Sequence, residues 1–344
     1  MPIVLSILDV GHGNSAVLSD TKGTVVIDAG PGSSLLEFLI QEGIKKIDVF
    51  LVSHADEDHI KGIIAVLSSN IVKVQYIKLN SDASKGSKLW DDLTYVLDQA
   101  NKNGKVAFDI GLTTNDSNKL NCGEISIEVL FPTPGLAAKG AGNIDHKGRS
   151  LTSNSMSAIV RLSRNEKPLV LLPGDIDGAS LNNLVEEGID LRSEIVVFPH
   201  HGGKPGFMDA KLFATQFCEL VNPRTVIFSI GRGKHGNPKP EIMEAVLSKV
   251  TMARIACTQL SEHCAGTFLK TSHTHLTSKF SGGREKNKCC AGTITIDLED
   301  PKLPILPNTL DHQRFIKHNA PTALCMKAHA GKVRNTTVGH APTQ

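Results

Sequence analysis

The segment that most constrains the fold is SHADEDH, residues 53–59, because it holds four potential metal ligands between two regular elements. The preceding run, residues 47–52 (IDVFLV), is apolar and β-branched, which predicts a buried strand. Residues 60–67 carry apolar side chains at helical spacing. His54 and Asp56 alternate in extended backbone and should share a face, whereas Asp58 and His59 should open the helix. Two pairs of ligands predict two metal ions, rather than a solvated acidic turn.

The same arrangement recurs further along the chain. Apolar runs at 169–172, 195–198 and 226–230 lead directly into the polar segments PGDID, PHHGG and GRGKHGNP. Loops at strand ends commonly carry the functional residues of α/β enzymes. The chain also alternates predicted strands with predicted helices, which favours sheets that are covered by helices. The polar residues that follow these strands are therefore candidate site residues: Asp175, His200, His201 and His235.

Composition bounds the class of protein. The chain has 344 residues, of which 40% are hydrophobic and 21% charged, so it can bury a large core in one large domain or two small ones. A formal net charge of +2 does not by itself indicate nucleic-acid binding. We find neither a signal-peptide pattern nor an apolar stretch of membrane-spanning length. The seven cysteines, an odd number, favour a reducing compartment, and we expect a cytoplasmic protein.

Seven segments in order carry a family resemblance: DVGHGNSAVL, VIDAG, SHADEDH, NSMSAIV, LPGDID, FPHHGG and HGNPKPEIM. Their order and spacing resemble the metallo-β-lactamase superfamily, and within it the hydrolase domain of the DNA-uptake protein ComEC. The resemblance implies an α+β fold, a four-layer αββα sandwich with the metals at one edge of the sheets. We expect this hydrolase domain to span residues 1–300 and to stand alone, without the membrane channel found in ComEC.

The resemblance also implies roles for individual residues. His54 and Asp56 would bind the first metal, Asp58 and His59 the second, Asp175 would bridge them, and His200 would complete the second site. Asp28 and Asn154 would support the ligands from behind. The usual motif has histidine where this chain has Asp56, and the first site lacks its third imidazole. The oxygen-rich first site favours a harder ion, such as Mn²⁺ or Mg²⁺, over Zn²⁺. For the two sites together we expect two divalent ions, Mn²⁺ or Zn²⁺, with Mg²⁺ as a further candidate.

The implied activity is that of a metal-dependent hydrolase, a phosphodiesterase or nuclease that attacks DNA or RNA with a metal-activated water. Asp58 would orient the water, and His201 or His235 would protonate the leaving oxygen, although His201 is equally interpreted as structural. Three basic residues on the same loops are candidate phosphate contacts: Lys204, Arg232 and Lys234. Two alternatives remain, a cyclic-nucleotide phosphodiesterase and a catalytically inactive module that binds metal or a partner.

The region after residue 250 is rich in cysteine and ends in a basic segment. A Cys-rich insert at about 257–290 holds five potential ligands of a structural Zn²⁺, to be weighed against buried free thiols: Cys257, His263, Cys264, Cys289 and Cys290. Residues 301–344 carry six lysines and arginines against one acid. We expect a basic extension that is solvated or partly disordered, with binding of nucleic acid or a protein partner as the alternative. The oligomeric state is not determined by these patterns.

Overall fold

The computed structural model describes residues 2–80, 86–266 and 274–326. Within these ranges the strands form two sheets. The eight-stranded sheet has the order β14-β13-β1-β2-β3-β4-β5-β6: β1 (Val4–Ile7), β2 (Ala16–Asp20), β3 (Gly23–Ile27), β4 (Lys46–Val52), β5 (Lys73–Leu79), β6 (Ala107–Ile110), β13 (Ile294–Asp297) and β14 (Ile305–Leu306). The six-stranded sheet has the order β12-β11-β10-β9-β8-β7: β7 (Ser126–Phe131), β8 (Ile159–Arg164), β9 (Lys167–Leu172), β10 (Ile195–Val197), β11 (Thr225–Phe228) and β12 (Arg254–Cys257).

Each sheet contains a set of parallel strands that helices connect. The run β3–β6 is parallel, and so is the run β9–β12. Parallel neighbours need a crossover connection, which the helices supply. The helices are α1 (Ser34–Gln41), α2 (Glu57–Ser69), α3 (Lys88–Lys102), α4 (Pro134–Lys139), α5 (Gly178–Glu186), α6 (Ala210–Val221), α7 (Pro240–Lys249) and α8 (Thr309–Asn319). The strand and helix predicted on either side of residues 53–59 are confirmed as β4 and α2.

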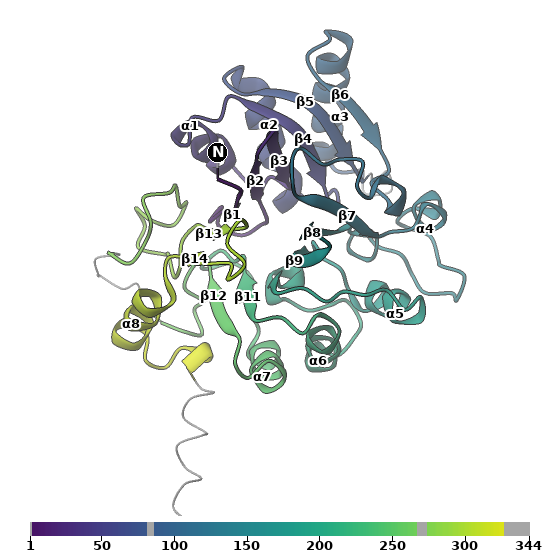
Figure 1. Cartoon of the computed structure of the whole chain (residues 1–344). Coiled ribbons are helices and arrows are strands. Elements are labelled where there is room, and N and C mark those ends of the chain that lie inside the picture. Colours follow the sequence, from purple (N-terminus) through teal and green to yellow (C-terminus); the bar gives the residue numbers. More distant parts are fainter. Residues whose placement is uncertain (1, 81–85, 267–273, 327–344) are drawn as a thin grey trace, which may run out of the picture.

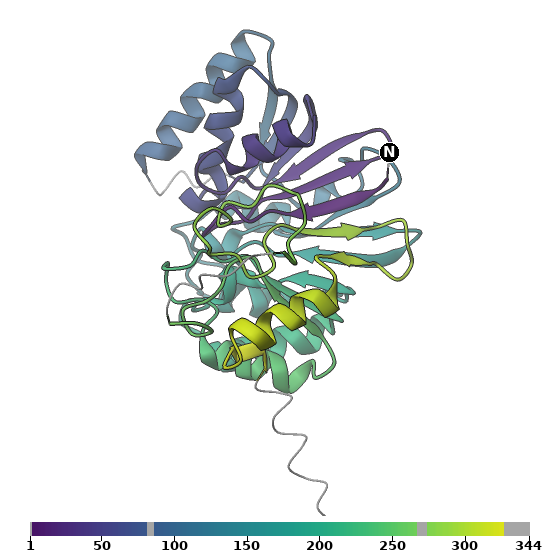
Figure 2. The same cartoon turned by 90° about the vertical axis from the view of Figure 1, so that its left-hand side faces the viewer.

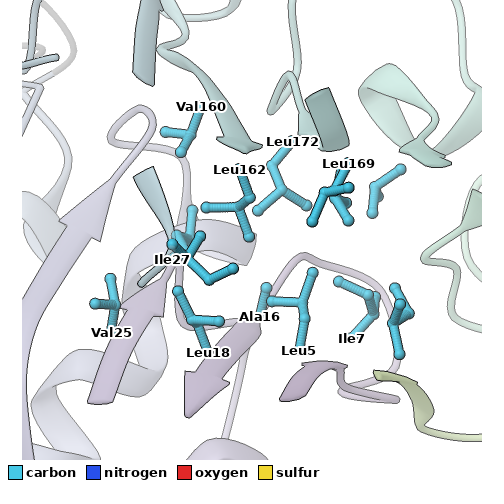
Figure 3. Packing of buried hydrophobic residues seen from close by; sticks show 14 of the residues in the cluster. Leu5, Ile7, Ala16, Leu18, Val25, Ile27, Val160, Leu162, Leu169 and Leu172 are labelled. Atoms are coloured by element: carbon cyan, nitrogen blue, oxygen red, sulfur yellow. The ribbon is translucent and has the colours of Figure 1, made fainter. Parts of the chain in front are cut away.

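The layers follow from the alternation of side chains along the strands. In β3, Val25 and Ile27 point into the core between the two sheets, whereas Val26 points into the core beneath the helices. Figure 3 shows the inter-sheet core, where Leu18 of one sheet and Leu162 of the other belong to one apolar cluster. Helices α1 to α3 cover one outer face and α5 to α7 the opposite face (Figure 1). The predicted four-layer αββα sandwich is therefore confirmed.

The C-terminal region returns to the first sheet. Strand β13 pairs with β1 in antiparallel fashion. Strand β14 adds to β13, and α8 follows it along the outside of the body (Figure 2). Phe315 and Ile316 of α8 belong to one apolar cluster with Leu260. The extension predicted to be solvated is thus packed on the body as far as residue 326, because α8 carries an apolar stripe. Residues 327–344 of that prediction lie outside the described part, and the boundary at residue 300 stays a prediction.

Among the described residues, we find no helix with the length and apolar character needed to cross a membrane.

Candidate metal centre

The site forms at the edge where the parallel strands of both sheets end. Asp28 follows β3, the SHADEDH segment follows β4, Asp175 follows β9 and His201 follows β10. The carboxyl ends of these strands are aligned within each sheet, because Ile27 pairs with Leu51 in one sheet and β10 is in register with β11 in the other. Loops at the carboxyl ends of parallel strands form the usual binding crevice of such sheets. Residues far apart in the sequence therefore meet at one place.

Four side chains make the centre of the site. The ligand atoms of Asp58, His59, Asp175 and His201 all lie within 4.8 Å of one another. Nε2 of His201 lies 3.1 Å from Oδ2 of Asp58 and 3.6 Å from Oδ2 of Asp175. Nε2 of His59 lies 3.3 Å from Oδ1 of Asp175. His59, Asp175 and His201 are buried, whereas the side chain of Asp58 is 24% exposed and so faces the solvent side.

A second group adjoins the first and shares Asp175. Nε2 of His54 lies 4.0 Å from Oδ2 of Asp56 and 4.0 Å from Oδ2 of Asp175. His54 is buried, and its Nδ1 contacts the hydroxyl oxygens of Ser53 at 3.0 Å and Ser157 at 3.3 Å. The structure thus gathers both predicted pairs of ligands, with Asp175 between them.

The structure places His201, and not His200, in the central group. Both residues have left-handed backbone, with φ of 54° and 50° respectively. Nδ1 of His201 donates to the carbonyl oxygen of Ser229 at 2.7 Å, which turns Nε2 toward the carboxylates. His200 points to the other side, where its Nδ1 lies 3.4 Å from Nδ2 of Asn154. We therefore correct the predicted ligand from His200 to His201, since the Ser229 carbonyl selects which ring turns inward.

Asp28 lies behind the site and contacts both Ser53 and His59. Its carboxylate accepts hydrogen bonds from the Ser53 amide at 2.7 Å, the Ser53 hydroxyl at 2.8 Å and Nδ1 of His59 at 2.7 Å. Because Nδ1 of His59 is engaged by Asp28, its Nε2 is the nitrogen that faces Asp175. A carboxylate behind a histidine is the usual way of fixing the tautomer of a metal ligand.

The charges of the central group reinforce one another. Burial alone would raise the pKa of Asp58, but the hydrogen bond from His201 and the charges of His59 and His201 hold it well below its ordinary value. For Asp175, burial likewise opposes ionisation, and the same two histidines lower its pKa well below the usual range. Burial would lower the pKa of His59, but the charges of Asp175 and Asp28 raise it. Both carboxylates are therefore ionised, as metal ligands must be.

Unpaired buried atoms indicate that the residues of this site can bind divalent cations. Among the described residues, the candidate ligands include three buried atoms without a hydrogen-bond partner: Nε2 of His54, Nε2 of His59 and Oδ1 of Asp175. Buried polar atoms are rarely left unpaired, and such exceptions often mark a missing ion or water. Imidazole nitrogens and carboxylate oxygens are the donors that Zn²⁺ and Mn²⁺ accept.

Sequence analysis missed His12. It follows β1, and its Nε2 lies 3.5 Å from Oδ2 of Asp58, while its ring centroid lies 4.5 Å from that of His201 and 4.6 Å from that of His235. Gly13 allows this approach, since a Cβ there would lie 2.3 Å from the carbonyl oxygen of Asp58. Burial and the charge of His201 lower the pKa of His12 to about 4. The signal was a histidine between two glycines directly after a predicted strand.

Comparison with known proteins agrees with this geometry. Residues 8–138 match the family described as the metallo-beta-lactamase superfamily. The chain contains a metallo-beta-lactamase superfamily domain. The predicted resemblance to this superfamily is therefore confirmed over residues 8–138.

One curated relative is ComE operon protein 3 of Bacillus subtilis, 22% identical over 263 residues. The match covers 70% of this chain and 30% of the relative, so the chain spans about a third of that protein. Similar solved structures include YhfI of Bacillus subtilis, with 12% identity, a TM-score of 0.45 and coverage of 74% of this chain and 96% of that one. Igni18 of Ignicoccus hospitalis has 16% identity and a TM-score of 0.40, and the match covers 74% of this chain and 94% of that one.

A cavity of about 860 Å³ opens beside the metallo-beta-lactamase site. It reaches the site at Asp56, Asn154 and His200, and further along it is lined by Lys204 and Phe207. The side chain of Phe207 is fully exposed, with a relative accessibility of 104%. Such an exposed aromatic ring beside a lysine can stack on a flat ligand.

The three predicted phosphate contacts have different surroundings in this metallo-beta-lactamase domain. Lys204 is exposed and lines the cavity, and Lys234 is exposed on the loop after β11. Arg232 is buried, and its guanidinium donates to the carbonyl oxygens of Leu260 at 3.0 Å and Ser261 at 3.2 Å. Arg232 therefore secures the turn at 260–265, and we reassign it from substrate to structure. His235 is exposed at the rim, as its predicted catalytic role requires.

The predicted zinc ligands separate into two groups. The thiol of Cys289 donates to Oδ2 of Asp9 at 3.2 Å, and His263 is exposed with Nε2 3.2 Å from the carbonyl oxygen of Gly236. The structure thus directs both of these side chains elsewhere. Cys257, Cys264 and Cys290 instead pack into a single cluster.

Proposed function

We propose that this metallo-beta-lactamase domain hydrolyses phosphodiester bonds of nucleic acids or nucleotides with the help of two divalent ions. The observation that carries the proposal is the donor set, three carboxylates and three imidazoles around two adjacent positions that share Asp175. A site this rich in oxygen suits Mn²⁺ and Mg²⁺ as well as Zn²⁺. The adjoining cavity, with Lys204 and the exposed Phe207, supports a ligand that is both anionic and aromatic.

The ligands divide between two ions. His54, Asp56 and Asp175 would hold one, and Asp58, His59, His201 and Asp175 the other. When bound, such a pair of ions supplies an acidified water as nucleophile and neutralises charge on the phosphoryl oxygens. Both ligand histidines of the second set have their far nitrogen fixed, His59 by Asp28 and His201 by Ser229. The ring positions are therefore set before any ion arrives.

The chain's own residues then bind and orient the substrate. Asp58 lies beside His201 and is partly exposed, so its carboxylate can also hold the attacking water in place. His235 is exposed at the rim next to His12 and is positioned to donate a proton to the leaving oxygen. From the cavity side, Lys204 binds a phosphate oxygen and Phe207 stacks on a base.

A second candidate is a cyclic-nucleotide phosphodiesterase, and the size of the cavity favours it. A volume of about 860 Å³ lies within the range of small-molecule sites, roughly 300–1,000 Å³. A single nucleotide would fit there without the extended groove that a polymer needs. A cytoplasmic location, and a protein partner for the basic extension, stay predictions.

The test is a hydrolysis panel with the purified full chain. Single- and double-stranded DNA, RNA and cyclic nucleotides are each incubated with Mn²⁺, Mg²⁺ or Zn²⁺. We expect cleavage of a polymer with Mn²⁺ and its loss in Asp175→Asn and His201→Gln. Asp190→Asn is the matched control, because Asp190 forms an exposed pair with Arg192 away from the site. Cleavage of cyclic nucleotides alone would favour the second candidate, and bound metal with no cleavage of any substrate would indicate an inactive module.

A further inference from the structure

A second cavity, the distal cavity, lies at the other end of the parallel strands from the metal centre. Its volume is about 710 Å³, and it borders the first residues of β10, β11 and β12. The metal centre forms where such strands end, so the length of the strands separates the two places. We propose that the distal cavity binds a small phosphorylated molecule of the size of a nucleoside diphosphate.

Two turns, one loop and the start of α8 enclose the distal cavity. The turns are residues 222–224, after α6, and residues 249–253, after α7. The loop is formed by residues 301–305, which lead into β14, and Thr309 lies at the amino end of α8. The body of the domain and the C-terminal segment therefore form this cavity jointly, and a ligand in it would contact both.

The lining of the distal cavity is basic. Four cations and one acid contribute to it, a formal balance of +3: Arg224, Lys249, Arg254, Lys302 and Glu194. The acid is shared, because Glu194 lies 3.1 Å from Nζ of Lys167 and 3.7 Å from Nη1 of Arg224. Lys249 pairs with Glu219 on the surface of the body. The single acid of the lining thus leaves a large part of its positive charge without compensation.

Arg254 contributes a half-buried charge to this lining. Its guanidinium donates to the carbonyl oxygens of Ile305 at 3.4 Å and Pro307 at 2.6 Å. In the part of the chain that the structure describes, its buried Nε has no hydrogen-bond partner and its charge has no carboxylate partner. Burial lowers the pKa of Arg254 to about 10, so the side chain is still charged at neutral pH. Charges in such surroundings are ordinarily paired, and a bound anion would supply the missing negative charge.

The chemistry of the lining indicates the class of ligand. Guanidinium and ammonium groups recognise phosphate, and a balance of +3 suits a ligand with two or three negative charges. Buried Leu303 and exposed Met252 add an apolar surface on which an organic group can rest. The volume lies in the range of small-molecule sites, roughly 300–1,000 Å³. A nucleoside diphosphate combines this charge with an apolar ring and a suitable size.

Titration calorimetry of the full chain with ADP tests the proposal. The parent protein is Asp175→Asn/His201→Gln in EDTA, so that no ion at the metal centre takes part and no hydrolysis is needed. We expect one ADP to bind per chain and adenosine not to bind, because the phosphates supply the recognition. Arg224→Gln/Lys302→Gln, the distal double variant, should lower the affinity for ADP about tenfold or more. A parent that does not bind ADP, or that binds adenosine equally well, would overturn the proposal.

Matched variants in the same background locate the bound ADP. Arg192→Gln/Lys211→Gln removes two exposed charges that lie outside the distal cavity and should leave the affinity for ADP unchanged. Lys204→Gln should also leave it unchanged, because Lys204 lines the cavity beside the metal centre. Loss of binding in Lys204→Gln, or undiminished binding in the distal double variant, would contradict the proposal. Arg254→Met should abolish binding, and if it does not fold, the distal double variant with its exposed substitutions still decides the question.

Discussion

Replacement of Asp28 by asparagine should weaken metal binding more than it weakens the fold. In the native chain, the carboxylate accepts from the Ser53 amide and from Nδ1 of His59, each at 2.7 Å. An asparagine oxygen can still accept from the Ser53 amide, but its NH₂ group then faces His59 and donates to Nδ1. The histidine must move its proton to Nε2, the atom that faces Asp175. Asn tolerates the left-handed backbone at this position, where φ is 61°.

The expected magnitude follows from the role of Asp28. Loss of a carboxylate behind a ligand histidine typically lowers metal affinity by about 10- to 100-fold, which is about 1.4–2.8 kcal/mol. The assay is titration of the metal-free protein with Mn²⁺ and Zn²⁺ against a chelating indicator, together with hydrolysis at saturating metal. Asp20→Asn is the matched control, because Asp20 is buried and accepts from the amides of Glu124 and Ile125 at 3.0 and 2.8 Å, far from any proposed ligand.

Both variants should lose roughly 1–3 kcal/mol of unfolding free energy through weaker hydrogen bonds to a buried charge. The metal affinity should fall in Asp28→Asn alone. Equal metal affinity in Asp28→Asn and the native chain would refute the argument from the tautomer.

Three further outcomes are expected. Gly13→Ala should abolish most hydrolysis, because the new Cβ would lie 2.3 Å from the carbonyl oxygen of Asp58 and would displace the loop. Hydrolysis is measured on the substrate found in the panel, and full activity would contradict this expectation. Ile127→Ala, in the inter-sheet core, should cost about 2–5 kcal/mol in denaturant unfolding, and a smaller loss would mean that the sheets close over the cavity. Burial opposes ionisation of Asp145, but hydrogen bonds from Arg149 lower its pKa. The contact between Asp145 and Arg149 therefore stabilises the fold above about pH 4, and this stabilisation is lost as the pH falls through the folded pKa. In Asp145→Asn, the melting temperature should depend less on pH in that acid range. An unchanged dependence would show that the contact contributes nothing to stability.

Local sequence pattern predicted much of the fold. A β-branched run followed by helical spacing is a local signal, and it correctly predicted β4 and α2. The alternation of strands and helices likewise predicted the layers, because each face of a sheet must be covered. The polar residues that follow strands were also found, since every ligand loop begins where an apolar run stops.

Local pattern failed where a choice depended on a residue distant in the sequence. His200 and His201 are neighbours with similar backbone, and the carbonyl of Ser229 decides which ring turns inward. No other candidate site residue lies next to His12 in the sequence, so its segment gave no sign of a role in the site. His12 joins the site because Gly13 lets its loop approach the loop that carries Asp58. Arg232 is a basic residue on a candidate site loop and was therefore predicted to contact phosphate. Its guanidinium instead donates to backbone carbonyl oxygens.

The cysteines show the same division. The sequence determined that thiols concentrate after residue 250, as it determined the density of ligands in SHADEDH. Only the tertiary structure decided that Cys325 joins Cys257, Cys264 and Cys290 while Cys289 turns to Asp9. The physical reason is that strand and helix propensity act over a few residues, whereas a metal site is defined by directions that side chains take after distant segments have packed.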